Sequence, residues 1–174
     1  MSEVIFVLGG CRSGKSRYAL ELAAQSDAVH KIFVATCQAQ DEEMRDRIER
    51  HQQERGAEWR TVEEPVHLSE TIAEQDGMKT LVLVDCLTLW ISNLLMQEAT
   101  AAEIQERCVR LENTLASCRG RVYLVSNEVG QGLVPEHPLG RVFRDQVGWL
   151  NQRMAAVADR VAWMVAGMPV LVKG

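Results

Sequence analysis

The sequence predicts an α/β fold in which a mainly parallel sheet is flanked by helices. Short apolar runs rich in β-branched residues alternate with longer segments of helical period, which is typical of strand-helix-strand units in a parallel sheet. A glycine-rich segment, residues 9–16, separates the first apolar run from the first helical segment. Only Gly167-Met168-Pro169 joins the last two runs, which predicts an antiparallel hairpin at one edge of the sheet.

Six apolar runs are predicted to be strands, because they are short, mostly rich in β-branched residues and separated by turns or by segments of helical period. In chain order they are Val4–Leu8, Lys31–Ala35, Thr80–Asp85, Arg121–Val125, Arg160–Ala166 and Val170–Lys173. The expected helices are Ser16–Gln25, Gln40–Arg55, Leu87–Gln97, Ala101–Cys118 and Leu139–Asp159. The fourth helix carries a stripe spaced four, three and four residues apart, at Ile104, Cys108, Leu111 and Leu115. A similar stripe in the fifth helix is formed by Leu139, Phe143, Val147, Leu150, Met154 and Val157.

Length and composition favour a single domain over residues 1–174, which we expect to be a nucleotide-binding domain. The 174 residues are 47% hydrophobic, which is enough for a sizeable core. The net charge of -5 offers no basic surface for nucleic acid. No window approaches the roughly 20 apolar residues that span a bilayer. The five cysteines are odd in number and form no C-x-x-C pair, so reduced thiols in the cytoplasm are expected.

The glycine-rich segment reads Gly9-Gly10-Cys11-Arg12-Ser13-Gly14-Lys15-Ser16 and matches the phosphate-binding loop, or P-loop. It lies between a predicted strand and a predicted helix, as that loop requires. Glycines let backbone N–H groups surround phosphate oxygens, and the helix N-terminus attracts negative charge. The Lys15 ammonium is expected to reach the phosphates, and the Ser16 hydroxyl to bind Mg²⁺. The expected fold is therefore P-loop NTPase-like, with GTP or ATP as substrate.

The strand Thr80–Asp85 ends in a carboxylate, as the metal-binding strand of this class does. Asp85 is therefore a candidate Mg²⁺ ligand, directly or through water. The alternative is that Asp85 only caps the helix that begins at Leu87, because Asp is a favoured N-cap residue.

The segment 41–51 is highly charged and places one histidine on a helix. Its acid and base pairs four residues apart explain most of it as a solvated helix face. Met44, Ile48 and His51 fall on the opposite, inward stripe. Periodicity alone favours a packed core histidine over a catalyst at position 51.

Several motifs together resemble those of the bifunctional adenosylcobinamide kinase / adenosylcobinamide-phosphate guanylyltransferase family of cobalamin biosynthesis. They are Gly9-Gly10-x-Arg12-Ser13-Gly14-Lys15-Ser16-Arg17, Asp41-Glu42-Glu43-Met44 with His51, Trp59-Arg60-Thr61, Asn127-Glu128-Val129-Gly130 and Asn151-Gln152. Cys11 departs from the small residue expected in the loop, and Asp85 stands where some relatives would have Glu.

The resemblance implies two reactions: phosphorylation of adenosylcobinamide, and transfer of GMP from GTP to the resulting phosphate through a guanylylated histidine, His51. It implies a homotrimer. It also implies nucleotide contacts at the loop and at Thr36, Cys37, Gln38, Gln52, Gln53, Glu54, Arg55, Glu63 and Asp85.

Two other functions are compatible with the phosphate loop alone. The first is a small-molecule P-loop kinase without nucleotidyl transfer, which would not need His51. The second is a regulatory nucleotide-binding module. The sequence lacks the Asn-Lys-x-Asp run with which such modules recognise guanine, which counts against this function. The glycine- and proline-rich segment 130–138 either contributes to the corrinoid site or only connects a strand to a helix.

Overall fold

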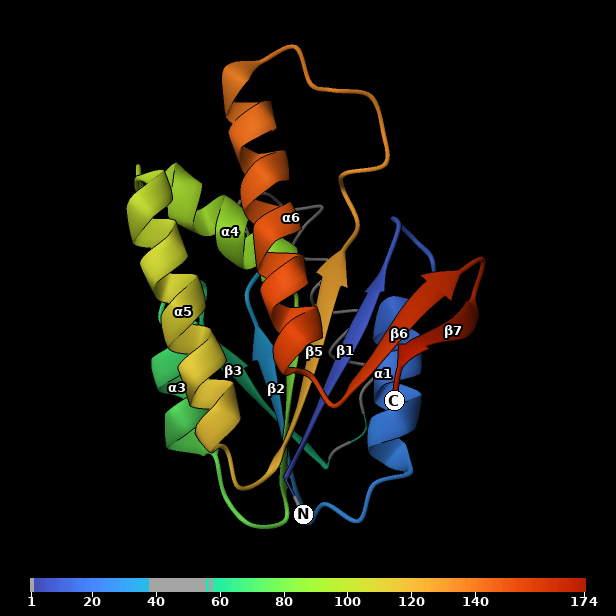
Figure 1. The fold of residues 1–174 in the computed structure, drawn as a ribbon. Helices are drawn as coiled ribbons and strands as arrows, with labels where there is room; N and C mark the ends of the chain where they lie inside the picture. Colours follow the sequence, from blue (N-terminus) through green and yellow to red (C-terminus); the bar gives the residue numbers. More distant parts are fainter. Residues whose placement is uncertain (1, 38–55, 57) are drawn as a thin grey trace.

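A seven-stranded sheet forms the centre of the computed structural model, which describes residues 2–37, 56 and 58–174. Its strand order is β3-β2-β4-β5-β1-β6-β7, and every neighbouring pair is parallel except β6 and β7 (Figure 1). The strands are β1 Glu3–Gly9, β2 His30–Ala35, β3 Trp59–Glu63, β4 Thr80–Asp85, β5 Arg121–Asn127, β6 Arg160–Val165 and β7 Met168–Lys173. The predicted α/β fold with an antiparallel edge is confirmed.

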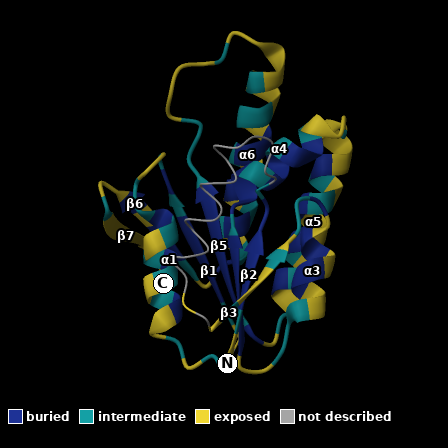
Figure 2. Ribbon diagram, turned by 180° about the vertical axis from the view of Figure 1, so that it is seen from behind, coloured by how far each residue is buried: buried dark blue, intermediate teal, exposed yellow. Residues whose placement is uncertain are grey.

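Helices cover both faces of the sheet (Figures 1 and 2). They are α1 Lys15–Ala24, α3 Leu68–Gln75, α4 Leu87–Met96, α5 Ala101–Ser117 and α6 Pro138–Val157. One hydrophobic core lies between the sheet and helices α3 to α6, and a smaller one lies between the sheet and α1. Successive strand residues alternate between the two cores, because side chains of a strand point to opposite faces. Each buried strand is therefore apolar on both sides.

Two elements, β3 and α3, were not predicted from the sequence. β3 is an edge strand with no fully buried residue, so its sequence lacks the apolar run that identifies a central strand. α3 has only eight residues and one short apolar face, which gives too few turns for a clear helical period. The expected helix Gln40–Arg55 lies outside the described residues.

The hairpin at the end of the chain turns earlier than predicted. The turn consists of Ala166 and Gly167, with φ values of 51° and 85°, and Val165 pairs directly with Met168. Two consecutive residues with positive φ are typical of the two-residue turns that match the twist of a hairpin. Pro169 therefore lies inside β7, where it is tolerated because β7 is an edge strand.

The apolar stripe predicted for α5 is confirmed, since its buried residues are Ile104, Cys108, Leu111 and Leu115. The stripe of α6 is confirmed only over the middle and later turns of the helix. Leu139, in the first turn, is 46% exposed because α6 begins beyond the carboxyl edge of the sheet (Figure 1). Gln146 and Asn151 are buried in this helix, although no apolar pattern identifies them.

Candidate active site

The loop between β1 and α1 has the backbone geometry of an anion-binding cradle. Gly14, the N-cap of α1, has φ 93° and provides no side-chain cap for the first helical turn. The amide groups of that turn are therefore available to phosphate oxygens. A Cβ atom at Gly9 would lie 2.7 Å from both the Met164 carbonyl oxygen and Ser13 Oγ, so only glycine fits there. Ser13 Oγ is buried and has no hydrogen-bond partner among the described residues.

Lys15 is buried at the base of this cradle, with 8% of its surface exposed. Its ammonium group donates a hydrogen bond to the Gly10 carbonyl oxygen at 2.6 Å. Burial lowers the pKa of Lys15 below its ordinary value, and the nearby Asp85 carboxylate opposes that shift. A buried cation with one carbonyl partner is well suited to neutralise a phosphate group.

Asp85 ends β4, two strands away from the loop strand β1, and is half-buried. The N-cap of α4 is Cys86, without a side-chain capping hydrogen bond, so the capping role considered for Asp85 is not observed. Ser16, at the second position of α1, is also half-buried. Both side chains offer the oxygen donors that Mg²⁺ prefers. Within residues 2–37, 56 and 58–174, no group of three His, Cys, Asp or Glu residues forms a complete metal site, so phosphate oxygens and water would supply the other ligands.

The Thr36 side chain is used inside the fold. Thr36 is fully buried, and its hydroxyl donates to the Cys86 carbonyl oxygen at 2.7 Å and accepts from the Cys86 amide at 2.8 Å. The Thr36 carbonyl oxygen accepts a hydrogen bond from Asn93 Nδ2 at 2.8 Å. Thr36 therefore joins the carboxyl ends of β2 and β4, and its expected contact with nucleotide stays a prediction. Cys37 follows it and is half-buried.

Glu63 lies at the carboxyl end of the edge strand β3 and is exposed. Ala35 of β2 pairs with Glu63 on one side and with Asp85 on the other. The structure thus brings Glu63, Thr36, Asp85 and the loop to one edge of the sheet. The predicted site residues Gln38, His51, Gln52, Gln53, Glu54 and Arg55 lie outside the described residues.

A polar cluster behind the loop was not assigned from the sequence. The Thr88 hydroxyl lies 3.2 Å from Ser126 Oγ and accepts from the Asn127 amide at 2.7 Å. Asn151 of α6 donates to the Asn127 carbonyl oxygen at 3.1 Å. Asn127 and Asn151 occur in the motifs of the resemblance, but nothing in their local pattern shows that they meet.

The segment between β5 and α6 projects beyond the carboxyl edge of the sheet (Figure 1). Arg144 donates to the Gly130 carbonyl oxygen at 2.6 Å, which ties the start of the segment to α6. The Glu128 carboxylate accepts from the Gly130 amide at 2.6 Å. Leu133, at the far end, is 98% exposed. The segment is thus an ordered connection that also presents an apolar side chain to solvent.

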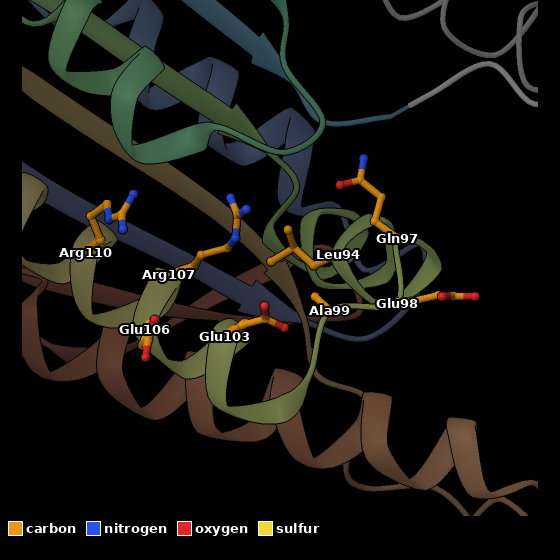
Figure 3. Close-up of a pocket in the computed structure, with 8 residues that line it drawn as sticks. All are labelled: Leu94, Gln97, Glu98, Ala99, Glu103, Glu106, Arg107 and Arg110. Carbon is orange, nitrogen blue, oxygen red and sulfur yellow. The ribbon is translucent and has the colours of Figure 1, made fainter.

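Two surface hollows lie away from the loop. One, of about 370 Å³, is formed by the end of α4, the following turn and α5, and its arginines Arg107 and Arg110 extend in the same direction (Figure 3). The other, of about 350 Å³, lies beside the amino-terminal ends of β2 and β3. Neither of these two hollows includes a residue of the phosphate loop.

Comparison with known proteins decides the family. The family model described as cobinamide kinase / cobinamide phosphate guanyltransferase matches residues 5–172. The chain belongs to this family. It is 46% identical over 168 residues to the bifunctional adenosylcobalamin biosynthesis protein CobP of Pseudomonas aeruginosa, covering 97% of this chain and 96% of that protein. It is 41% identical over 186 residues to CobU of Escherichia coli K12, covering 98% and 99%. At the level of the family, the prediction of a bifunctional kinase and guanylyltransferase is confirmed.

Solved structures share the fold at low sequence identity. A Pyrococcus horikoshii protein, PH0250, aligns with a TM-score of 0.57 and 12% identity, covering 99% of this chain and 86% of that chain. The type III secretion ATPase EscN of enteropathogenic E. coli aligns with a TM-score of 0.58 and 11% identity, covering 94% of this chain and 43% of that chain. These matches support the P-loop NTPase-like fold predicted from the sequence.

Two further observations concern membrane-spanning helices and disulfides. None of the helices in the described parts of the chain is long and apolar enough to cross a membrane. None of the five cysteines forms a disulfide.

Proposed function

We propose that this chain phosphorylates the side-chain hydroxyl of adenosylcobinamide with GTP or ATP, and then transfers GMP from GTP to that phosphate. The second step would proceed through a guanylyl-histidine at His51 and give adenosylcobinamide-GDP. The observation that carries the proposal is the joint presence of a phosphate cradle with a buried Lys15 and a family match over residues 5–172. One domain formed by residues 1–174 would serve both steps.

In the kinase step, the loop amides and the Lys15 ammonium would hold the β- and γ-phosphates. The cobinamide hydroxyl oxygen attacks the γ-phosphorus, the bond to the β–γ bridging oxygen breaks, and a nucleoside diphosphate leaves. Ser16 and Asp85 would hold Mg²⁺, which neutralises charge on the phosphate oxygens when bound. The Lys15 pKa is lowered by burial, but Asp85 beside it favours the charged form that phosphates need.

In the guanylyltransfer step, a neutral imidazole nitrogen of His51 attacks the α-phosphorus of GTP, and pyrophosphate leaves. An oxygen of cobinamide phosphate then attacks the guanylyl phosphorus, the N–P bond breaks, and free His51 is restored. The same loop would bind the leaving pyrophosphate and stabilise its charge. Thr36, Cys37, Gln38, Gln52, Gln53, Glu54, Arg55 and Glu63 are proposed nucleotide contacts on the resemblance to the family.

Labelling with GTP that carries a radioactive α-phosphate tests the histidine step. We expect an acid-labile, base-stable protein adduct that is absent in His51→Ala. The matched control is His67→Ala, because His67 is exposed and caps α3 without a side-chain hydrogen bond. This control should form the adduct as the wild type does.

The kinase step is measured separately as transfer of the γ-phosphate to cobinamide. His51→Ala should keep this activity, since the imidazole acts only in the second step. A wild-type protein that phosphorylates cobinamide but forms no adduct would exclude the guanylyl-histidine and leave the small-molecule kinase as the function.

We further propose that the enzyme is a cytoplasmic homotrimer. The trimer is expected from the resemblance to the family, and exposed apolar surface supports a subunit interface. β7 is exposed along its length (Figure 2), and its exposed apolar residues are Met168, Val170, Leu171 and Val172. Trp149 on α6 is 50% exposed. Apolar surface of this kind commonly marks an interface between proteins. Trp90, by contrast, is a core residue, since 1% of it is exposed. Light scattering after gel filtration would give three times the monomer mass of 19.5 kDa, and a monomeric mass would refute the trimer.

A further inference from the structure

Asn127 stands directly beside the first residue of the phosphate loop. β5 lies between β1 and β4 in the sheet, and Asn127, its last residue, pairs with Gly9. The amide of the next residue, Glu128, donates to the Gly9 carbonyl oxygen at 3.0 Å. The end of β5 is therefore joined to the start of the loop.

The alternation of side chains along β5 gives the face on which Asn127 lies. Val125 belongs to the core beneath α1, whereas Leu124 belongs to the core beneath the other helices. Ser126 follows Leu124 by two residues, and its hydroxyl meets Thr88 of α4, as the alternation requires. Asn127 follows Val125 by two residues and so lies on the α1 face.

The charged groups of the loop site lie on that same face. Leu83 of β4 belongs to the core beneath α1, so Asp85, two residues later, also lies on the α1 face. Lys15 is the first residue of α1 itself. In the register, Asp85 pairs with Val125, which places Asn127 one strand across from Asp85 and two residues further along. With neighbouring strands about 4.8 Å apart and a rise of about 3.3 Å per residue in parallel strands, these two positions are about 8 Å apart, a separation that a phosphate group can bridge.

The backbone of Asn127 is fixed on both sides while its side chain is available. Thr88 accepts from its amide, and Asn151 donates to its carbonyl oxygen. Asn151 is 6% exposed, and its own Oδ1 is buried without a hydrogen-bond partner among the described residues. The Asn127 side chain is half-buried and makes no hydrogen bond to another described residue. The fold thus holds the position of this residue rigidly and leaves its amide group to a ligand.

We propose that the Asn127 side-chain amide donates a hydrogen bond to the terminal phosphate of the nucleotide held in the loop. This contact would distinguish a triphosphate from a diphosphate and orient the γ-phosphoryl group for transfer. The inference rests on the proposed function only in taking the loop to bind a nucleoside triphosphate.

Binding measurements on Asn127→Ala test this contact. The probes are GDP and a GTP analogue with a non-hydrolysable β–γ bridge, titrated by calorimetry. Asn127→Ala removes a hydrogen bond to a charged group, which contributes to the binding of the triphosphate only. The ratio of triphosphate affinity to diphosphate affinity should therefore fall about tenfold or more. The matched control is Asn113→Ala, because Asn113 is exposed on α5 and should leave both affinities unchanged.

A second variant, Asn127→Asp, keeps the shape of the side chain and its place in the backbone network. It brings a carboxylate beside the terminal phosphate and should weaken triphosphate binding more than Asn127→Ala does. Equal losses for GDP and the GTP analogue, or an Asn127→Asp variant that binds the analogue as well as wild type, would overturn the proposal. If wild type binds the analogue but does not phosphorylate cobinamide, the proposed function fails, whereas the affinity ratio still decides the role of Asn127.

Discussion

The link between Thr36 and Cys86 predicts a specific loss of stability in Thr36→Val. Valine has nearly the shape of threonine but lacks the hydroxyl, which both donates to the Cys86 carbonyl oxygen and accepts from the Cys86 amide. The carbonyl oxygen also accepts from the Trp90 amide at 3.2 Å, so it stays paired in the variant. The Cys86 amide loses its partner in a site where Thr36 is fully buried.

The magnitude follows from that single unpaired donor. A buried polar group left without a partner costs about 1–3 kcal/mol, so we expect Thr36→Val to lower the free energy of unfolding by about 2 kcal/mol. For a domain of this size, each kcal/mol shifts the melting temperature by about 2–4 °C, which gives a fall of about 4–8 °C. Thr36→Ser keeps the hydroxyl and removes one methyl group, so its loss should be nearer 1 kcal/mol.

Urea denaturation followed by circular dichroism measures both variants against wild type. The hydroxyl of Thr36 already has its partners within the fold, so the proposed contact of Thr36 with nucleotide would come from its backbone. GTP affinity of the folded Thr36→Val protein should therefore be close to that of wild type. The reasoning is refuted if the free energy of unfolding of Thr36→Val lies within about 0.5 kcal/mol of the wild-type value, or if Thr36→Ser loses as much stability as Thr36→Val. A large loss of GTP affinity without loss of stability would instead show that the hydroxyl contacts the nucleotide.

Two other predictions concern the loop. Burial holds the pKa of folded Lys15 below its unfolded value, so between these two values the unfolded chain binds the extra proton and wild-type stability rises with pH. Urea denaturation at pH 7 and pH 10 should therefore show that the free energy of unfolding of wild type increases relative to that of Lys15→Met at the higher pH. The same difference in free energy of unfolding at both pH values would contradict this. Cys11 is exposed in the loop, whereas burial raises the pKa of Cys86 to about 12. At neutral pH a thiol reagent should modify Cys11 and spare Cys86, and bound GTP should slow the Cys11 reaction; mass spectrometry that shows no protection would refute the placement of phosphate there.

Central strands and long helices were predictable because burial on both faces leaves a clear pattern in the sequence. Thr80–Asp85 is observed with the predicted bounds, and the α5 stripe is buried as expected. β3 was missed because an edge strand needs no apolar run, and α3 because it is short. Leu139 is exposed because α6 begins beyond the sheet. The spacing of apolar residues in α6 does not show where the helix begins relative to the sheet.

The phosphate loop was predictable as a unit, because its glycines, lysine and serine act through local backbone geometry. Asp85 was predictable from its place at the end of a buried strand. Only the structure showed that Cys86, not Asp85, is the N-cap of α4. The role of Asp85 as a metal ligand stays a prediction. Thr36 came from the resemblance, and its hydrogen bonds to Cys86 join residues 50 positions apart.

The sequence by itself therefore determined the α/β class, the phosphate loop and the resemblance to a family, because each depends on short motifs and periods that are local in the chain. Only the tertiary structure decided which side chains meet the loop. Asn127, Thr88 and Asn151 come from three separate elements, and the strand order brings them together beside Gly9. Strand order depends on long-range pairing between segments, and no local period or spacing encodes it.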